Sequence, residues 1–502
     1  MENVEHQPTH ATYFEKDEVV TLSPEHREYL LKRHGTVELD PLPTASDADP
    51  YNWPAWKKVT NLLLVAFHAL MSTFIAASII PAYELIAEDL NVSLQRASYL
   101  TSLQIAIIGG GPLFWRPIST RFGRRPIFLI SLIGTALFNI ACARTESYGA
   151  MATCRAFAAF FICPASAIGS AVVVETFFKK ERAKYMGIWT LMITLGVPLA
   201  PFIMGFVAHH IGYRWIYWIL AMINGVQLLL YLFLGPETRY LRKGVAHNEP
   251  PIREEYFKFR RIDSTPFVLK EFISPLRMAK YPCVLIPALA YAMVFLFGSV
   301  LLTVEIPQLF AHKFHFNPQQ LGYQFVGIII GSLIGEQIGG YASDKWMNRG
   351  SKNDGAARPA PEYRLWLSYA GYLLTICGVI VFLVRIEQAP EGHWNVTPIV
   401  GAAIAAAGNQ VVTTVLITYA VDCYHEEAAS IGVFITFVRQ VWGFIGPFWF
   451  PPMFEQVGVA KSAGVTSALL VAVSLIPTIF LQWKGQKIRG GGRQMVAETT
   501  AT

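Results

Sequence analysis

Four ionisable residues lie inside long apolar stretches of the sequence, where a charge is expensive to place. They are Arg155, Glu305, Arg439 and His68. A charge at the centre of a bilayer costs about 3 kcal/mol or more, so each residue is a candidate for proton coupling or for pairing with a charged solute. Glu305 lies in the outer third of the seventh span, where a carboxylate could take a proton from outside and release it inward, because desolvation favours the protonated form of a carboxyl group. Each also has a structural interpretation, as a hydrogen-bonded contact between helices or as a side chain that reaches the membrane surface.

Amides and aromatic rings within the same apolar stretches indicate a binding cavity. Amide groups donate to and accept from a solute, and aromatic rings form an adaptable apolar wall. The same groups also join helices to one another without any ligand. The candidate cavity residues are Gln104, Tyr291, Asn409, Gln410 and Trp442.

The sequence does not indicate enzymatic, metal or nucleotide chemistry. Its 6 cysteines lie in or beside apolar runs without a CxxC pair, and we expect them to be small core residues. The pairs His209–His210 and His312, His315 lack carboxylate or thiolate neighbours at ligand spacing. There is no Walker loop and no set of nucleophile and base. We therefore expect no metal, no cofactor and no catalytic residue.

The composition indicates that these residues are positioned by membrane-spanning helices. Of the 502 residues, 53% are hydrophobic and only 15% are charged, whereas soluble domains average about 25% charged residues. A net charge of +6 on a chain of this length also argues against nucleic-acid binding. The main partner of the chain is expected to be the lipid bilayer.

Twelve apolar runs are long enough to cross a bilayer core, which takes roughly twenty helical residues. They predict an all-α membrane protein, with twelve transmembrane helices in two pseudo-symmetric six-helix bundles. The predicted spans are Val59–Ile80, Ala97–Leu113, Pro126–Cys142, Gly149–Thr176, Met186–Ala208, Trp215–Leu234, Val284–Ile306, Leu321–Ala342, Leu365–Val384, Pro398–Ala420, Ile431–Phe450 and Gly464–Leu481.

Lys and Arg gather in the second-to-third, fourth-to-fifth and sixth-to-seventh connections, which places those connections and both termini in the cytoplasm. The Asn-x-Ser/Thr sequons at Asn91 and Asn395 fall in connections placed outside, so both are candidate N-glycosylation sites. A charged, proline-bearing interval separates six spans from six. The expected divisions are an N-terminal segment (1–56), a first bundle (57–235), a central loop (236–281), a second bundle (282–483) and a tail (484–502).

The two halves carry related sequences. Lys180-Glu181-Arg182-Ala183, before the fifth span, corresponds to His425-Glu426-Glu427-Ala428 before the eleventh. Arg121-Phe122-Gly123-Arg124-Arg125, after the second span, corresponds to Gly340-Tyr341-Ala342-Ser343-Asp344-Lys345 after the eighth. Duplicated halves of six spans are typical of alternating-access carriers with a substrate site between the halves.

At these residues the chain resembles the major facilitator superfamily, over nearly everything from Trp53 to Trp483. The cytoplasmic signature loop of that family is matched in the first half, although Arg116 replaces its first glycine and Thr120 replaces its aspartate. The resemblance implies a charge cluster that latches the halves when the carrier is open outward, with Asp344 and Glu175 compensating for Thr120. The implied latch residues are Arg121, Gly123, Arg124, Arg125, Glu175, Gly340, Asp344 and Lys345.

Further motifs resemble the fungal twelve-span drug:proton antiporter branch of that family. Arg155 is similar to the family's intramembrane arginine, and Gly196, Pro201 and Gly205 resemble the glycine and proline pattern of exporting antiporters. Asp49-Pro50-Tyr51-Asn52-Trp53-Pro54, Glu336-Gln337-Ile338-Gly339-Gly340 and Phe437-Val438-Arg439-Gln440 also resemble this branch.

The resemblance implies a proton-coupled secondary transporter that exports small organic solutes such as drugs, toxins or secondary metabolites. The alternatives left open are a proton-symport uptake permease for a nutrient or polyamine-like cation, and a non-transporting membrane sensor. Its partners would be protons and a small-molecule substrate. We expect a monomer in the plasma membrane, with the vacuolar membrane as the alternative.

Overall fold

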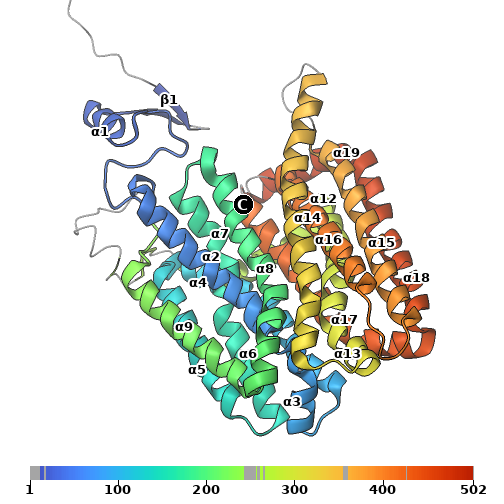
Figure 1. Ribbon diagram of the computed structural model, residues 1–502. Helices are drawn as coiled ribbons and strands as arrows, with labels where there is room; N and C mark the ends of the chain where they lie inside the picture. Colours follow the sequence, from blue (N-terminus) through green and yellow to red (C-terminus); the bar gives the residue numbers. More distant parts are fainter. Residues whose placement is uncertain are drawn as a thin grey trace, which may run out of the picture.

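The chain folds into helices that form two bundles side by side (Figure 1). The computed structural model describes residues 12–15, 18–241, 256, 261–263, 266–353, 360–424 and 427–500. Within these ranges, the two strands are β1 (Thr12–Glu15) and β2 (Glu18–Thr21), which pair as a short antiparallel hairpin before the first bundle. Helix α1 (Pro24–His34) and the turn η1 (Pro50–Asn52) follow them.

The first bundle contains the six spans predicted before the central loop. Its fourth span is divided at Cys163, because Pro164 begins a new helix without a backbone N–H to continue the previous one. The elements are α2 (Ala55–Ala77), η2 (Ile80–Ala82), α3 (Tyr83–Asp89), α4 (Leu94–Phe122), α5 (Arg125–Arg144), α6 (Tyr148–Ile162), α7 (Pro164–Thr176), α8 (Lys179–Ile211) and α9 (Arg214–Leu234).

The second bundle contains the other six, and two of its spans include a π-helical turn. The short elements α11 (Leu269–Ile273) and η3 (Ser274–Lys280) lead into it. Its elements are α12 (Pro282–Phe295), η4 (Leu296–Leu301), α13 (Leu302–Phe314), α14 (Pro318–Asn353), η5 (Pro361–Leu365), α15 (Trp366–Gln388), α16 (Thr397–Cys423), α17 (Ala428–Val457), α18 (Val459–Leu470), η7 (Val471–Leu475) and α19 (Ile476–Thr500).

Every predicted span falls on a helix, but only 11 helical stretches of the described chain are both long and apolar enough to cross a membrane. The predicted second span lies in α4, which has 29 residues but is not among the 11. The outer half of α4 carries Ser98, Thr101, Ser102 and Gln104, all of them buried. These polar side chains lower the hydropathy of α4, and a membrane helix tolerates them here because they are buried inside the protein.

The halves meet along two pairs of helices, α8 with α14 and α4 with α17. At the ends predicted to lie outside, Gly205 of α8 packs directly on Gly322 of α14, and the rings of Tyr99 and Phe448 stack 4.4 Å apart. The hairpin and α1 lie at the opposite end of the molecule from α3 (Figure 1). The outer ends of the two halves are therefore in contact in this structure.

Candidate functional site

Arg155 on α6 is buried among polar groups from three other helices. Its exposed fraction is 1%. The Nη2 atom donates to Gln104 Oε1 at 2.8 Å and to the Ala76 carbonyl at 3.2 Å, and the Nε and Nη1 atoms donate to the Leu100 carbonyl and the Tyr217 hydroxyl at 3.4 Å each. Gln104 returns a bond to the Arg155 carbonyl at 3.0 Å. In the described chain no carboxylate lies within ion-pair distance of Arg155, so its guanidinium is stabilised by hydrogen bonds to uncharged oxygens.

Glu305 lies in the first turn of α13 in the second half, and its exposed fraction is also 1%. The side-chain amide of Gln308 donates to its Oε1 at 3.2 Å. Tyr83 of the first half interacts electrostatically with both Glu305 and Arg155, and its hydroxyl donates to Thr101 Oγ1 at 2.8 Å. The structure therefore places Glu305 and Arg155 near the boundary between the halves, because α13 packs on α4, and α4 supplies Leu100 and Gln104 to Arg155.

Arg439 lies near the middle of α17 beside an aromatic pair. Its Nη1 donates to the Tyr291 hydroxyl at 2.8 Å, and its guanidinium carbon lies 4.6 Å from the centre of the Phe295 ring. Arg439 and Tyr291, assigned to different roles from the sequence, are thus direct partners. Trp442 lies half-buried one turn further along α17 and packs against the apolar core.

The amides of α16 link the two halves. Gln410 Nε2 donates to Glu336 Oε2 at 3.0 Å and to Thr194 Oγ1 on α8 at 3.2 Å. The Asn409 amide donates to Gln410 Oε1 at 3.2 Å, while Asn409 Oδ1 is buried without a partner in the described chain. These amides form a polar contact between the halves at mid-helix.

His68 lies away from these groups, inside the first half. It is fully buried, with Nε2 3.1 Å from the Ser131 hydroxyl and its ring edge-on to Phe128. Among the described residues, the hydrogen-bond and ring partners of His68 all belong to the first half: Ser131, Phe128 and Tyr231. This environment matches the structural interpretation of a histidine between helices.

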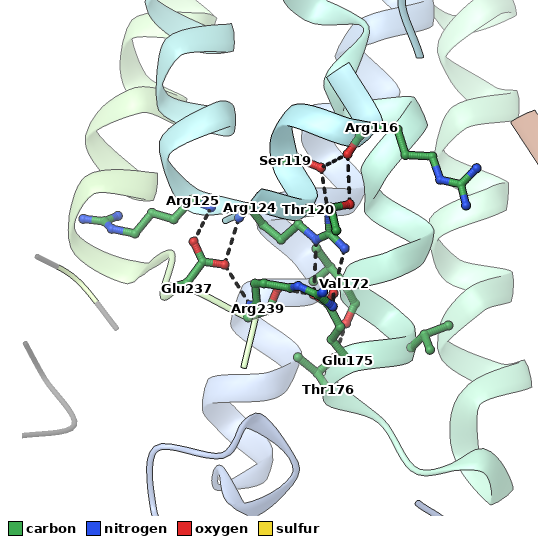
Figure 2. A network of polar contacts seen from close by, with 12 residues as sticks. Arg116, Ser119, Thr120, Arg124, Arg125, Val172, Glu175, Thr176, Glu237 and Arg239 are labelled. Atoms are coloured by element: carbon green, nitrogen blue, oxygen red, sulfur yellow. Dashed lines mark hydrogen bonds and ion pairs between the residues drawn. The ribbon is translucent and has the colours of Figure 1, made fainter. Parts of the chain in front are cut away.

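Arg124, Arg125 and Glu175 of the predicted latch lie in a dense charge cluster on the first half (Figure 2). Arg124 Nη2 binds Glu175 Oε1 at 2.8 Å, and Arg124 Nη1 donates to Ser119 Oγ at 2.6 Å. Glu175 also accepts from the Thr238 hydroxyl at 2.8 Å. All these partners belong to the first half or to the chain that leaves it. In this conformation, with the outer ends in contact, Glu175 therefore organises one half. Its expected role in the latch belongs to the outward-open state and stays a prediction.

Glu237, which the sequence analysis missed, is the second acid of this cluster. Its two carboxylate oxygens accept from the backbone N–H groups of Arg124, Arg125 and Arg239, at 2.8, 3.0 and 2.8 Å (Figure 2). Burial raises the pKa of Glu237 above its ordinary value, and the three N–H groups oppose that shift. The available signal was an acid directly after Pro236 at the end of the sixth span, close to the basic loop only in three dimensions.

Gly123 ends α4 and allows this arrangement. Its φ of +96° lies in the region that glycine tolerates best, and an added Cβ would collide with the Glu237 carboxylate. Arg125 donates to the Tyr231, Leu232 and Gly235 carbonyls, which caps the end of α9. The loop therefore fixes α4, α5 and α9 relative to one another.

Two basic residues extend the cluster toward the second half. Arg121 pairs with Glu271 of α11 at 2.7 Å. Arg116 Nη1 donates to Ser430 of α17 at a long 3.5 Å. The Thr120 hydroxyl donates to the Arg116 carbonyl at 3.0 Å, so it binds its own helix and does not replace the missing acid.

The second copy of the signature is less completely described. Gly340 has no neighbour within 4 Å of an added Cβ, and Lys345 lies 5.4 Å from the centre of the Tyr341 ring. The side chain of Asp344 lies outside the described residues, as do His425 and Glu426. The expected role of Asp344 stays a prediction.

The glycine and proline pattern of α8 makes two close helix contacts. An added Cβ on Gly196 would collide with the Thr73 hydroxyl and the Leu70 carbonyl of α2. Gly205 and the carbonyl of Pro201 lie against Gly322 of α14. The pattern thus packs α8 on its own half with one glycine and on the other half with the next.

Two other groups of predicted residues lie at the surfaces of the bundles. Asn91 and Asn395 are both exposed, in the short connections before α4 and α16. At the other end, the Tyr51 ring stacks on Phe178 at 5.1 Å and its hydroxyl donates to the Val174 carbonyl at 2.6 Å. The Asp49–Pro54 motif therefore attaches the N-terminal segment to the α7–α8 connection.

Comparison with known proteins identifies the class of this architecture. The sequence profile of the Major Facilitator Superfamily matches residues 62–447. The chain belongs to the Major Facilitator Superfamily, and it is a multi-pass membrane transporter rather than an enzyme.

Relatives of similar length are found in fungi. The chain is 26% identical over 459 residues to the MFS transporter cpaT of Aspergillus oryzae, with 90% of this chain and 91% of that protein covered. It is 24% identical over 467 residues to the efflux pump radE of Floropilus chiversii, with 89% and 84% covered.

A solved structure has the same fold. It is a bacterial homolog of the human lysosomal transporter Spinster in an inward-facing, unoccupied conformation. The TM-score is 0.61 at 14% sequence identity, covering 87% of this chain and 99% of that one.

Proposed function

We propose that the chain is a proton-coupled exporter of small organic solutes that works by alternating access. The observation that carries the proposal is that Glu305 and Arg155 are buried in different halves, and that α13, which carries Glu305, packs on α4, which binds Arg155 through Leu100 and Gln104. In the proposed cycle, protonation of Glu305 changes the electrostatic interaction between the half that carries Glu305 and the half that carries Arg155. A relative named as an efflux pump supports the outward direction.

The proton step follows from the cost of burial. A charged carboxylate loses several kcal/mol of hydration when it enters a closed interface, and protonation removes most of that cost. In the proposed cycle Glu305 takes a proton from outside when the outer ends are apart. The neutral side chain is then enclosed as the outer ends close, and its proton leaves toward the cytoplasm before the next solute binds.

Arg155 supplies the fixed positive charge of the cycle. Its four acceptors include the Gln104 side chain and the Tyr217 hydroxyl, which keep the guanidinium in place without neutralising it. A fixed cation favours the charged form of Glu305 when the two approach and so assists loss of the proton. The same charge disfavours a second cation in the region.

The basic connections and the two sequons also support a membrane orientation and an N-glycosylated protein. We propose the plasma membrane, with basic connections in the cytoplasm and glycans on Asn91 and Asn395. Both asparagines are exposed at the ends of the helices assigned to the outside. Digestion with an N-glycosidase should lower the apparent mass of the protein expressed in a eukaryotic host, and no change would contradict the glycan assignment.

The deciding experiment is transport into inside-out membrane vesicles from cells with and without the protein. Vesicles acidified inside should accumulate solute from a labelled panel, and an uncoupler should abolish that accumulation. Loss of solute from preloaded vesicles under the same gradient would reverse the direction and indicate an uptake permease. Accumulation that an uncoupler leaves unchanged would remove the proton from the mechanism.

A further inference from the structure

Arg439 lies on the face of α17 that meets the other half. Its neighbour Gln440 packs on Gly109 of α4, and Gly443, one turn further, lies against Ile105 of α4 and Phe295 of the second half. Arg439 itself is half-buried. The guanidinium therefore stands at the boundary between the halves, where alternating-access carriers bind their solute.

Among the described residues, hydrogen bonds engage only the Nη1 side of this guanidinium. Nη1 donates to the Tyr291 hydroxyl at 2.8 Å. Nε is buried without a hydrogen-bond partner, and Nη2 has none among the described residues. Every side chain of the described chain that could neutralise the charge lies beyond the 4.0 Å ion-pair limit, including Glu336, which binds Gln410 instead.

The unpaired Nε–Nη2 edge of Arg439 is complementary to a carboxylate group. The Nε and Nη2 hydrogens of arginine point in parallel and match the two oxygens of one carboxylate. Phe295 lies 4.6 Å from the guanidinium carbon and, with the bond to Tyr291, holds its orientation. A buried donor without an acceptor is costly, so a ligand that supplies the acceptor is favoured over one that does not.

We infer that Arg439 is the anion-recognition residue of the solute site and that the transported solute carries a carboxylate on an apolar, aromatic-compatible body. The inference rests on the proposed export function for its location. It selects organic acids from the wider range of drugs, toxins and metabolites, and it argues against polyamine-like cations.

The test measures ligand binding to the purified full-length protein in detergent, using the shift in thermal unfolding temperature as the readout. The probes are benzoate, 1-naphthoate and biphenyl-4-carboxylate, each compared with its neutral carboxamide and its aminomethyl cation. At least one carboxylate should bind about tenfold or more tightly than its amide, as expected for a charge-assisted bidentate pair. Carboxylates that bind no better than their amides would overturn the inference.

Variants at Arg439 test whether this residue causes the preference for carboxylate over amide. Arg439→Gln should remove the preference for carboxylate over amide, and Arg439→Lys should retain part of it, because lysine keeps the charge without the fork. Arg385→Gln, at an exposed arginine bonded to Gln388, is the matched control and should leave the preference intact. Variants are compared only when their unliganded unfolding temperatures match the parent, and a preference that survives Arg439→Gln contradicts the assignment.

Transport assays in vesicles distinguish failure of the carboxylate assignment from failure of the proposed export function. Export of amides or cations with no export of carboxylates would refute the solute class and leave the exporter intact. Carboxylate binding that depends on Arg439, without gradient-driven movement of any probe, would refute the proposed exporter and leave the binding site.

Discussion

In the proposed cycle, Glu305 is the single side chain that couples transport to the proton gradient. It is enclosed in the second half, with Gln308 as its hydrogen-bond donor, and it interacts electrostatically with Tyr83 of the first half. A group in this position changes the interaction between the halves whenever it gains or loses a proton.

Glu305→Gln should abolish transport driven by a proton gradient, because glutamine imitates the protonated carboxyl group and cannot release the proton. We expect at least a tenfold loss of driven flux, measured in acid-loaded vesicles. Exchange of solute at equal pH should continue, since both halves can still move. Glu391→Gln, at an exposed glutamate, serves as the control, and driven flux at the parental level in Glu305→Gln would eliminate Glu305 from the mechanism.

Arg155→Lys should impair both transport and stability. Lysine cannot reach the four acceptors that the guanidinium contacts, so Gln104 and buried carbonyls lose donors. Each buried acceptor left without a partner costs about 1–3 kcal/mol. The unfolding temperature and driven flux of the purified protein measure the two effects, with Arg385→Lys as control. Parental values for both would show that Arg155 is neither an anchor nor a coupling residue.

At the scale of elements, the end of α4 determines how the first half is assembled. Gly123 lets the chain turn with a positive φ, and the Glu237 carboxylate fills the space where a side chain would be. Three backbone N–H groups then converge on that carboxylate. The absence of a side chain at Gly123 therefore lets the Glu237 carboxylate link α4, α5 and the end of α9.

Gly123→Ala should destabilise the protein more than Gly212→Ala. The two glycines have φ values of +96° and +90° with extended ψ, so the backbone strain on alanine is similar, about 1–3 kcal/mol. Only residue 123 would also collide with Glu237, whereas nothing lies within 4 Å of an added Cβ at residue 212. Unfolding temperatures of the two variants should differ by several degrees. Equal temperatures would mean that the Glu237 contact contributes little.

At the scale of the whole molecule, contact between the outer ends depends on two glycines that allow backbones to touch. The Gly205 and Gly322 main chains leave no room for a side chain between α8 and α14. The stacked rings of Tyr99 and Phe448 close the other pair, α4 and α17. Alternating access requires both contacts to form and separate in each cycle.

Gly205→Leu should hold the outer ends apart, because its side chain would meet the Pro318 carbonyl and the Gly322 backbone, which cannot move aside. A Phe202→Cys probe on α8, half-buried in the parent, should react faster with an impermeant maleimide. Transport should fall at least tenfold. Gly225→Leu is the control, since an added Cβ there meets nothing within 4 Å. An unchanged reaction rate would show that Gly205 does not govern closure.

The sequence by itself determined the helices and the class of the protein. Long apolar runs bounded by charge must become membrane helices, because lipid offers no partner for unpaired backbone groups. The duplicated motifs then indicated two bundles and a carrier, which the match to the Major Facilitator Superfamily confirms. The polar α4 lies where it was predicted although its hydropathy is low, because the flanking charges and the neighbouring runs defined it.

Only the tertiary structure decided which polar residues act together. Glu237 and Arg124 are far apart in sequence, and so are Arg155 and Glu305, so no local period relates them. His68 and Arg439 looked equivalent as single charges in apolar runs, yet one binds Ser131 within a bundle and the other faces the boundary with an edge unpaired. Hydrophobic periodicity fixes where a helix runs, whereas the partner of a buried polar group depends on packing between distant segments.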